Sequence, residues 1–285
     1  MKTKAFFFAI SLIFISLNIF SQQREVPPVT LEKVSGNIYE IIGGSGANGG
    51  AFIGENNVLV IDSKMDEGSV KQTIEAIGKI TDKPIKYLVN THSDGDHIMG
   101  NRWFPETVTF VAHENCRDDF FKVNFGRESD WDEPAFFPFV PSITFKNEMT
   151  LWMGHEKIEL YYFGVGHTSG DCVVYFPEEK VAFIGDQYFT GRPQLIHSNK
   201  NGNSFGHVKT LTKMLENIGA EKFSSGHSDI VGRDAIKKHI QAMAERQGKV
   251  KELIGQGKSM EEVLAEFSEN EARLITSIYN EIKGQ

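Results

Sequence analysis

The chain has 285 residues, which is enough for one large domain with a buried core or for two small domains. Hydrophobic residues make up 40% of the chain and charged residues 24%, as is usual for a soluble globular protein. The formal net charge is −8 and there is no basic run. This composition argues against a nucleic-acid partner, because phosphate binding requires a surface of Lys and Arg.

The first 22 residues have the pattern of a secretory signal peptide. Lys2 and Lys4 flank the start of an almost uninterrupted apolar run over residues 5–20, and the sequence turns polar at Ser21. The alternative is an uncleaved anchor, but the run is slightly short of the ~20 apolar residues that a membrane span needs. We therefore expect cleavage near residues 21–23, a periplasmic or secreted protein, and no stable membrane anchor after cleavage.

The mature chain predicts two groups of strands, each followed by helices. β-Branched residues and turn signals predict strands at residues 29–34, 38–42, 51–53, 58–61, 85–89 and 108–111, then at 157–163, 173–176, 181–184 and 222–224. Helical spacing of apolar residues predicts helices over 68–81, around Cys116, over 208–218 and from residue 233 onward. This order predicts an α/β or α+β sandwich with two β-layers inside and helices outside.

The two cysteines, Cys116 and Cys172, stand far apart and form no disulfide framework. An exported protein could pair them. However, Cys172 lies in a strand-like run, where cysteine is a common small core residue. Free thiols are therefore favoured.

Ligand-type side chains are concentrated directly after the strand 85–89. Within six residues the chain carries two histidines and two aspartates: His92, Asp94, Asp96 and His97. Imidazole and carboxylate are the usual ligands of a catalytic zinc-type ion, and a turn can aim several side chains at one point. The alternative for this segment alone is an acidic surface loop with incidental histidines.

Three more ligand-type residues follow later strands, each beside a glycine: His167, Asp186 and His227. Any one of them could be an ordinary turn residue. Because side chains at the ends of successive strands converge on one edge of a sheet, the four segments together predict a metal site. The segment Gly44–Gly49 matches G-x-G-x-x-G, but a strand follows it rather than a helix, which excludes a dinucleotide fold. That loop is interpreted as a hairpin over the site or as a plain turn.

These motifs resemble the metallo-β-lactamase superfamily, whose pattern is T-H-x-H-x-D-H, then G-H-T, G-D and G-H in the same order. The resemblance covers about residues 30–230. It implies a four-layer αββα sandwich over residues 23–230, with the site at one edge of the β-layers. Residues 231–285 would then be a C-terminal helical extension.

The resemblance also implies a ligand set for two zinc ions. His92 and His167 would hold the first ion, Asp186 would bridge, and the second ion would be held by Asp96, His97 and His227. The family's second histidine is Asp94 in this chain. We expect Asp94 to bind the first ion through oxygen, which favours manganese or iron more than a third imidazole would; the alternative is a weak or empty first site.

The implied activity is that of an exported hydrolase in which a metal-activated water cleaves an ester, lactone, thioester or amide bond, β-lactams included. Asp96 would orient the nucleophile as a catalytic residue. The alternative is a catalytically weak metal-binding protein of the same fold. We expect a small-molecule substrate, with Tyr188 and Arg192 as candidate contacts, and a homo-oligomer is compatible with the sequence. The remaining histidines have no motif context and are expected to be surface or structural residues: His113, His155, His197, His207 and His239.

Overall fold

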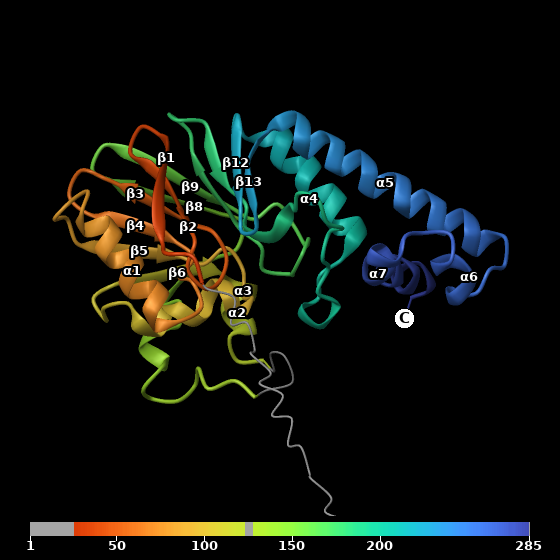
Figure 1. Ribbon diagram of the computed structural model, residues 1–285, viewed down its shortest axis with the longest axis horizontal. Helices are drawn as coiled ribbons and strands as arrows, with labels where there is room; N and C mark the ends of the chain where they lie inside the picture. The colour runs from red at the N-terminus through yellow and green to blue at the C-terminus, as the bar shows by residue number, and fades with distance from the viewer. Residues whose placement is uncertain (1–25, 123–127, 285) are drawn as a thin grey trace, which may run out of the picture.

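The computed structural model describes residues 26–122 and 128–284 of the chain (Figure 1). The predicted signal peptide, residues 1–22, lies outside the described residues. Within the described part, no helix has both the length and the hydrophobicity that crossing a membrane requires.

The first sheet has seven strands that lie side by side in chain order. They are β1 (Thr30–Ser35), β2 (Ile38–Ile42), β3 (Gly49–Ile53), β4 (Val58–Ile61), β5 (Ile85–Val89), β6 (Thr109–His113) and β7 (Ile143–Phe145). Strands β1 to β4 are antiparallel, and the pairs from β4 to β7 are parallel. The crossovers between parallel strands place helices α1 (Glu67–Gly78) and α3 (Glu114–Asp119) on one face of this sheet (Figure 1).

The second sheet has six strands. In spatial order they are β13 (Ser228–Gly232), β12 (Lys222–Ser225), β11 (Val181–Phe183), β10 (Val173–Phe176), β9 (Glu156–Tyr161) and β8 (Glu148–Met153). Helices α4 (Ser204–Asn217) and α5 (Arg233–Gly255) cover its outer face.

Alternation along the strands builds the layers. In β4, Leu59 and Ile61 point into the core between the two sheets, whereas Val58 and Val60 face the helices of the first layer. In β10, Val174 and Phe176 enter the same central core, and their neighbours face α4 and α5. The result is the four-layer αββα sandwich that the sequence predicted.

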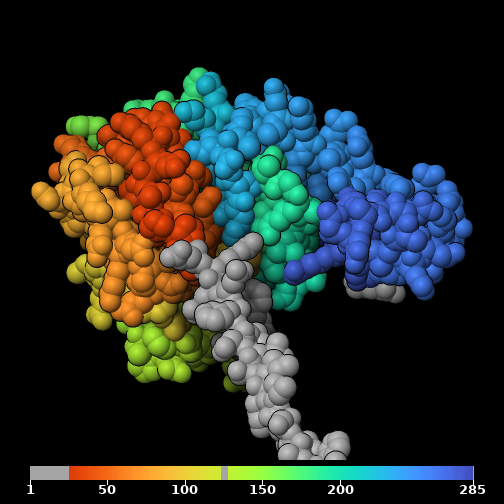
Figure 2. All heavy atoms as spheres, viewed as in Figure 1, coloured from red at the N-terminus to blue at the C-terminus, as the bar shows by residue number. Residues whose placement is uncertain are grey.

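The C-terminal helices form a further hydrophobic cluster. The long helix α5 leads into α6 (Met260–Leu264) and α7 (Ala272–Lys283), and their apolar faces pack together around Val250 and Ile275. Ser259 begins α6 with the capping box that the sequence predicted. Figure 2 shows this extension projecting from the sandwich. The domain boundary at residue 230 falls inside β13 and stays a prediction.

Three strands escaped the sequence analysis: β7, β8 and β13. β7 has only three residues, and β8 and β13 are edge strands whose side chains are mostly exposed or half-buried; Trp152 of β8 is 63% exposed. The expectation for the cysteines is confirmed, since Cys116 and Cys172 are both free and buried.

Candidate metal centre

The seven predicted ligands all lie where strands end. β5 leads into the segment that carries His92 and the short helix α2 (Gly95–Ile98). In the second sheet, β11 and β12 are parallel, and β9 runs the same way because both β9 and β11 are antiparallel to β10. The loops after β9, β11 and β12, which carry His167, Asp186 and His227, therefore meet at one edge of the sandwich.

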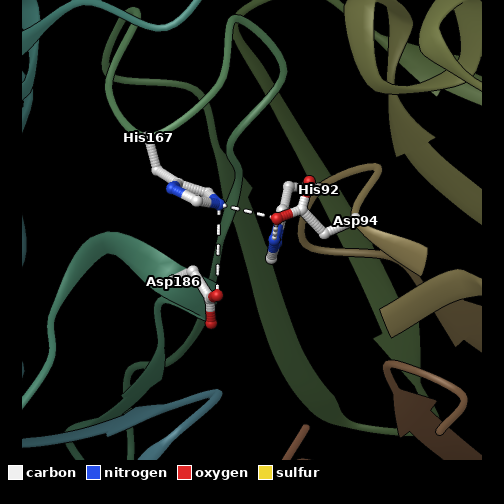
Figure 3. A group of neighbouring side chains, drawn as sticks. All are labelled: His92, Asp94, His167 and Asp186. Atoms are coloured by element: carbon white, nitrogen blue, oxygen red, sulfur yellow. Dashed lines mark hydrogen bonds and ion pairs between the residues drawn. The ribbon is translucent and has the colours of Figure 1, made fainter. Parts of the chain in front are cut away.

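Four of these residues form a buried group (Figure 3): His92, Asp94, His167 and Asp186. Each offers one ligand atom, and all four atoms lie within 4.8 Å of one another. Asp94 Oδ2 is 3.0 Å from His167 Nε2 and 3.6 Å from His92 Nε2. The replacement of the family's histidine by Asp94 therefore keeps a ligand-type atom in the group.

Asp96, His97 and His227 form a second group with the same 4.8 Å criterion. Asp96 Oδ2 lies 3.0 Å from His227 Nε2. Asp186 reaches this group as well, because its Oδ1 is 3.2 Å from His97 Nε2 and its Oδ2 is 3.4 Å from His227 Nε2. Asp186 thus lies between the two groups, where a bridging ligand is expected.

Asp62, at the end of β4, orients two of the imidazoles. Its Oδ2 accepts from the Thr91 hydroxyl at 2.8 Å and pairs with His97 Nδ1 at 2.7 Å. Because Thr91 Oγ1 donates to Asp62, it is free to accept from His92 Nδ1, 3.0 Å away. Both rings are therefore held with Nδ1 protonated and the Nε2 lone pair directed into the site, as for metal-binding histidines.

A separate set of contacts orients His167. Its Nδ1 donates to the Leu195 carbonyl at 2.8 Å, which directs Nε2 toward Asp94 Oδ2, 3.0 Å away, where the protonated ring donates and where a metal would replace the proton. The turn that carries it is held by Asp171, whose Oδ1 accepts from the backbone N–H of Thr168 at 3.0 Å. Burial raises the pKa of the Asp171 carboxyl, although the neighbouring His167 and Thr168 partly offset this.

Unpartnered buried atoms at the centre fit a metal. His92 Nε2, His97 Nε2 and Asp186 Oδ1 are buried and make no hydrogen bond. Buried polar atoms are almost always paired, so imidazole and carboxylate atoms that converge without a partner fit the donor set of a divalent cation. Gly226 lies so close that a Cβ there would be 2.3 Å from Asp186 Oδ1, so only glycine lets the ligands approach.

The loop between β2 and β3 is fastened beside the second group. Lys64 Nζ donates to the carbonyls of Gly43 and Ala47, each at 2.7 Å, and burial lowers the pKa of this lysine to about 8. The loop backbone also bonds to Asp96 O and Gly226 O, on either side of the site. The predicted hairpin loop is therefore fixed in place beside the site by these hydrogen bonds.

The charges at the site are strongly coupled. Burial alone would raise the pKa of Asp94, but the imidazoles of His167 and His197 hold it well below its usual range. Burial opposes ionisation of Asp96 too, yet its hydrogen bond with His227 lowers its pKa to about 2. Against burial, the carboxylates raise the pKa values of His167 and His227 to about 9. Without a metal, these imidazoles bind protons at neutral pH.

Two further residues contact the centre that the sequence analysis missed. His197 Nε2 lies 3.0 Å from Asp94 Oδ2, and Lys200 Nζ is 2.7 Å from Asp94 Oδ1. Both side chains are buried. The sequence analysis expected only a surface or structural role for His197. It did not predict a place at the site because His197 lies in an irregular loop with no motif. The only available signal was the histidine missing at position 94.

The two candidate substrate contacts, Arg192 and Tyr188, lie in different surroundings. The Arg192 guanidinium is 3.9 Å from the Phe189 ring centroid, and Phe189 stacks on His227 at 5.8 Å, so Arg192 is exposed close to the second group. The Tyr188 ring packs edge-on against His239 at 5.3 Å, within the hydrophobic cluster of the second sheet. A role in substrate binding stays a prediction for both residues.

Comparison with known proteins identifies the superfamily of this chain. The family model of the metallo-beta-lactamase superfamily matches residues 42–227, and the chain belongs to this superfamily. A metallo-beta-lactamase type 2 of Elizabethkingia meningoseptica is 24% identical over 273 residues, which cover 88% of this chain and 98% of that protein.

Solved structures agree on the fold. The crystal structure of the DIM-1 metallo-beta-lactamase aligns with a TM-score of 0.63 at 24% identity, covering 78% of this chain and 99% of the other. The metallo-beta-lactamase FIM-1 from Pseudomonas aeruginosa, in its mono-zinc form, gives a TM-score of 0.62 at 17% identity, covering 76% and 96%.

Proposed function

We propose that this chain is a metal-dependent hydrolase with two metal ions held at one edge of its β-sandwich. The observation that carries the proposal is the pair of ligand groups, with Asp186 of the first group also 3.2 Å from His97 of the second, and with buried and unpartnered ligand atoms in both. A structural role for so many buried imidazoles and carboxylates would leave their unpaired atoms unexplained. The competing function, a catalytically weak metal-binding protein, is motivated by Asp94 alone.

Zinc is the proposed metal in both positions, because imidazole and carboxylate donors in a compact set suit it. The FIM-1 structure, named as a mono-zinc form, shows that a protein of this fold holds that ion. The oxygen of Asp94 lets manganese or iron compete at the first site.

A bound divalent ion supplies Lewis acidity and lowers the pKa of water. The residues of the chain supply orientation. Asp96 keeps 27% of its side chain exposed and, with its pKa of about 2, is ionised at neutral pH. It can therefore accept a hydrogen bond from the attacking water and orient that water for attack. His227, 28% exposed, lies on the same accessible side, whereas His92 and His167 are fully enclosed.

The proposed substrate is a small molecule with an ester, lactone, thioester or amide bond. A β-lactam is included because of the name of the Elizabethkingia relative, but the fold hosts many chemistries and does not select one. Arg192, exposed over Phe189, whose ring stacks on His227, is proposed to pair with a substrate carboxylate. Action outside the cytoplasm, in the periplasm or medium, remains part of the proposal and follows from the leader sequence.

The test is a hydrolysis screen over β-lactams, lactones, thioesters and esters. Activity should disappear with chelator and return with zinc or manganese. Asp96→Ala should lose activity by about three orders of magnitude or more and keep its fold, whereas His155→Ala, an exposed residue on a turn, should remain fully active. Activity that survives exhaustive chelation would refute the proposal. A protein that binds two metals but cleaves nothing would favour the binding alternative.

A further inference from the structure

We propose that His197 supplies the third imidazole of the first metal site and so takes over the role of the histidine that Asp94 replaces. The inference rests on the proposed function, because it assigns a ligand to the same centre. The sequence motifs of the family do not reach His197, which lies in the irregular loop between β11 and α4.

The geometry around Asp94 carries the proposal. Three imidazole Nε2 atoms surround Asp94 Oδ2: His167 at 3.0 Å, His197 at 3.0 Å and His92 at 3.6 Å. Ligand atoms about one tetrahedral ion with bonds of ~2.0–2.1 Å are separated by ~3.3 Å. The three separations, each measured from Asp94 Oδ2, lie on either side of this value at 3.0 to 3.6 Å. His92 Nε2 is buried and has no hydrogen-bond partner, which points to an ion within this cluster.

The position of His197 is built into the fold. Its backbone N–H donates to the His167 carbonyl at 2.9 Å, and its own carbonyl accepts from the N–H groups of Lys200 and Gly202. A Cβ at Gly202 would lie 2.2 Å from the His167 carbonyl oxygen, so glycine allows the two loops to touch. The preceding residue, Ile196, is buried in the cluster formed by the C-terminal helices. The extension thus anchors the loop that carries the proposed ligand.

Lys200 explains how a carboxylate fits beside three imidazoles. Its ammonium donates to Asp94 Oδ1 at 2.7 Å and to the Ser93 carbonyl at 2.8 Å. This leaves Asp94 one oxygen, Oδ2, for the ion. The charge of Lys200 balances that of Asp94, so the site keeps the net charge of a set of neutral imidazoles. The metal is then less weakened as a Lewis acid than the aspartate alone would suggest.

The alternative role for His197 is that of a hydrogen-bond donor that merely orients Asp94. Glutamine tests the difference, because its amide N–H can replace a donor but a glutamine side chain is a poor substitute for an imidazole ligand. Loss of an orienting partner costs about 10–100-fold in metal affinity, so loss of a ligand should cost at least about 100-fold.

The experiment measures zinc per chain, zinc affinity and the visible spectrum of the cobalt-substituted protein. It compares the wild type with His197→Ala, His197→Gln and the exposed control His155→Ala. We expect two zinc ions in the wild type and the control. Both His197 variants should lose the first ion or bind it at least ~100-fold more weakly, with a changed cobalt spectrum.

The outcomes separate the two proposals. If His197→Ala binds both ions as the wild type does, or if His197→Gln alone restores wild-type affinity, His197 is not a ligand and the hydrolase proposal stands. If the wild type binds no zinc at all, the proposed function fails as well. If both variants fail to fold, nitrogen-15 NMR of histidine in the wild type decides. Zinc should shift the Nε2 signals of five imidazoles, and a His197 signal that does not move would overturn the inference.

Discussion

Asp62 supports the second metal site from behind, and replacing it by asparagine tests that support. The carboxylate accepts the backbone N–H of Thr91 through Oδ1 at 2.8 Å. Through Oδ2 it accepts the Thr91 hydroxyl at 2.8 Å and His97 Nδ1 at 2.7 Å. In Asp62→Asn, one of the two oxygens becomes an NH₂ group that cannot accept. Whichever way the amide turns, at least one buried donor then faces another donor.

The expected magnitude follows from these contacts. A buried donor left without its acceptor costs about 1–3 kcal/mol, so the metal-free protein should lose about that much stability. His97 also loses the charge that fixes its ring and its tautomer. Loss of such a partner typically weakens metal binding by about 10–100-fold, and we expect this for the second site.

Denaturant unfolding in chelator and competition with a chromophoric zinc chelator measure the two effects separately. The matched control is Glu40→Gln. Glu40 is a buried carboxyl in β2 that accepts from Ser224 Oγ at 2.7 Å, and burial raises its pKa, so a neutral amide fits there. The control should keep wild-type zinc affinity. If Asp62→Asn also binds both zinc ions with wild-type affinity, the role given to Asp62 is wrong.

Three other perturbations have definite expected outcomes. Lys200→Met leaves Asp94 Oδ1 buried without its charged donor, while His167 still pairs with Oδ2, so the metal-free protein should lose about 1–3 kcal/mol in denaturant unfolding; an unchanged stability would contradict the pairing. Asp94→His should destabilise the protein because it sets an imidazole against Lys200, and the double variant Asp94→His/Lys200→Met should recover part of the loss.

Zinc binding at pH 7 should release protons, since the pKa values of His167 and His227 are raised to about 9 without metal; calorimetry in buffers of different ionisation enthalpy measures this. For the same reason the stability that these two groups give the metal-free protein is present below pH 6.5 and lost as the pH rises toward 9, and a flat profile over that window would refute it.

The layers of the sandwich and seven of the ligands could be predicted from the sequence because they depend on local sequence patterns. Alternation in β4 determines which side chains face each layer. Histidines and aspartates that follow strand ends beside a glycine predict that these side chains meet at one edge of the sheets. The position of His197 at the site could not be predicted from such patterns. Its loop has no period, and its place depends on contacts with His167 and with the distant C-terminal cluster. β13 was missed because an edge strand need not show an apolar pattern.

Anomalous diffraction at the zinc edge, from crystals of the protein grown with zinc, tests the two-metal centre most directly. We predict two peaks about 3.5–4 Å apart. One should lie within ~2.0–2.2 Å of the Nε2 atoms of His92, His167 and His197, and the other should lie among Asp96, His97 and His227. A single peak, or none within bonding distance of these residues, would contradict the account.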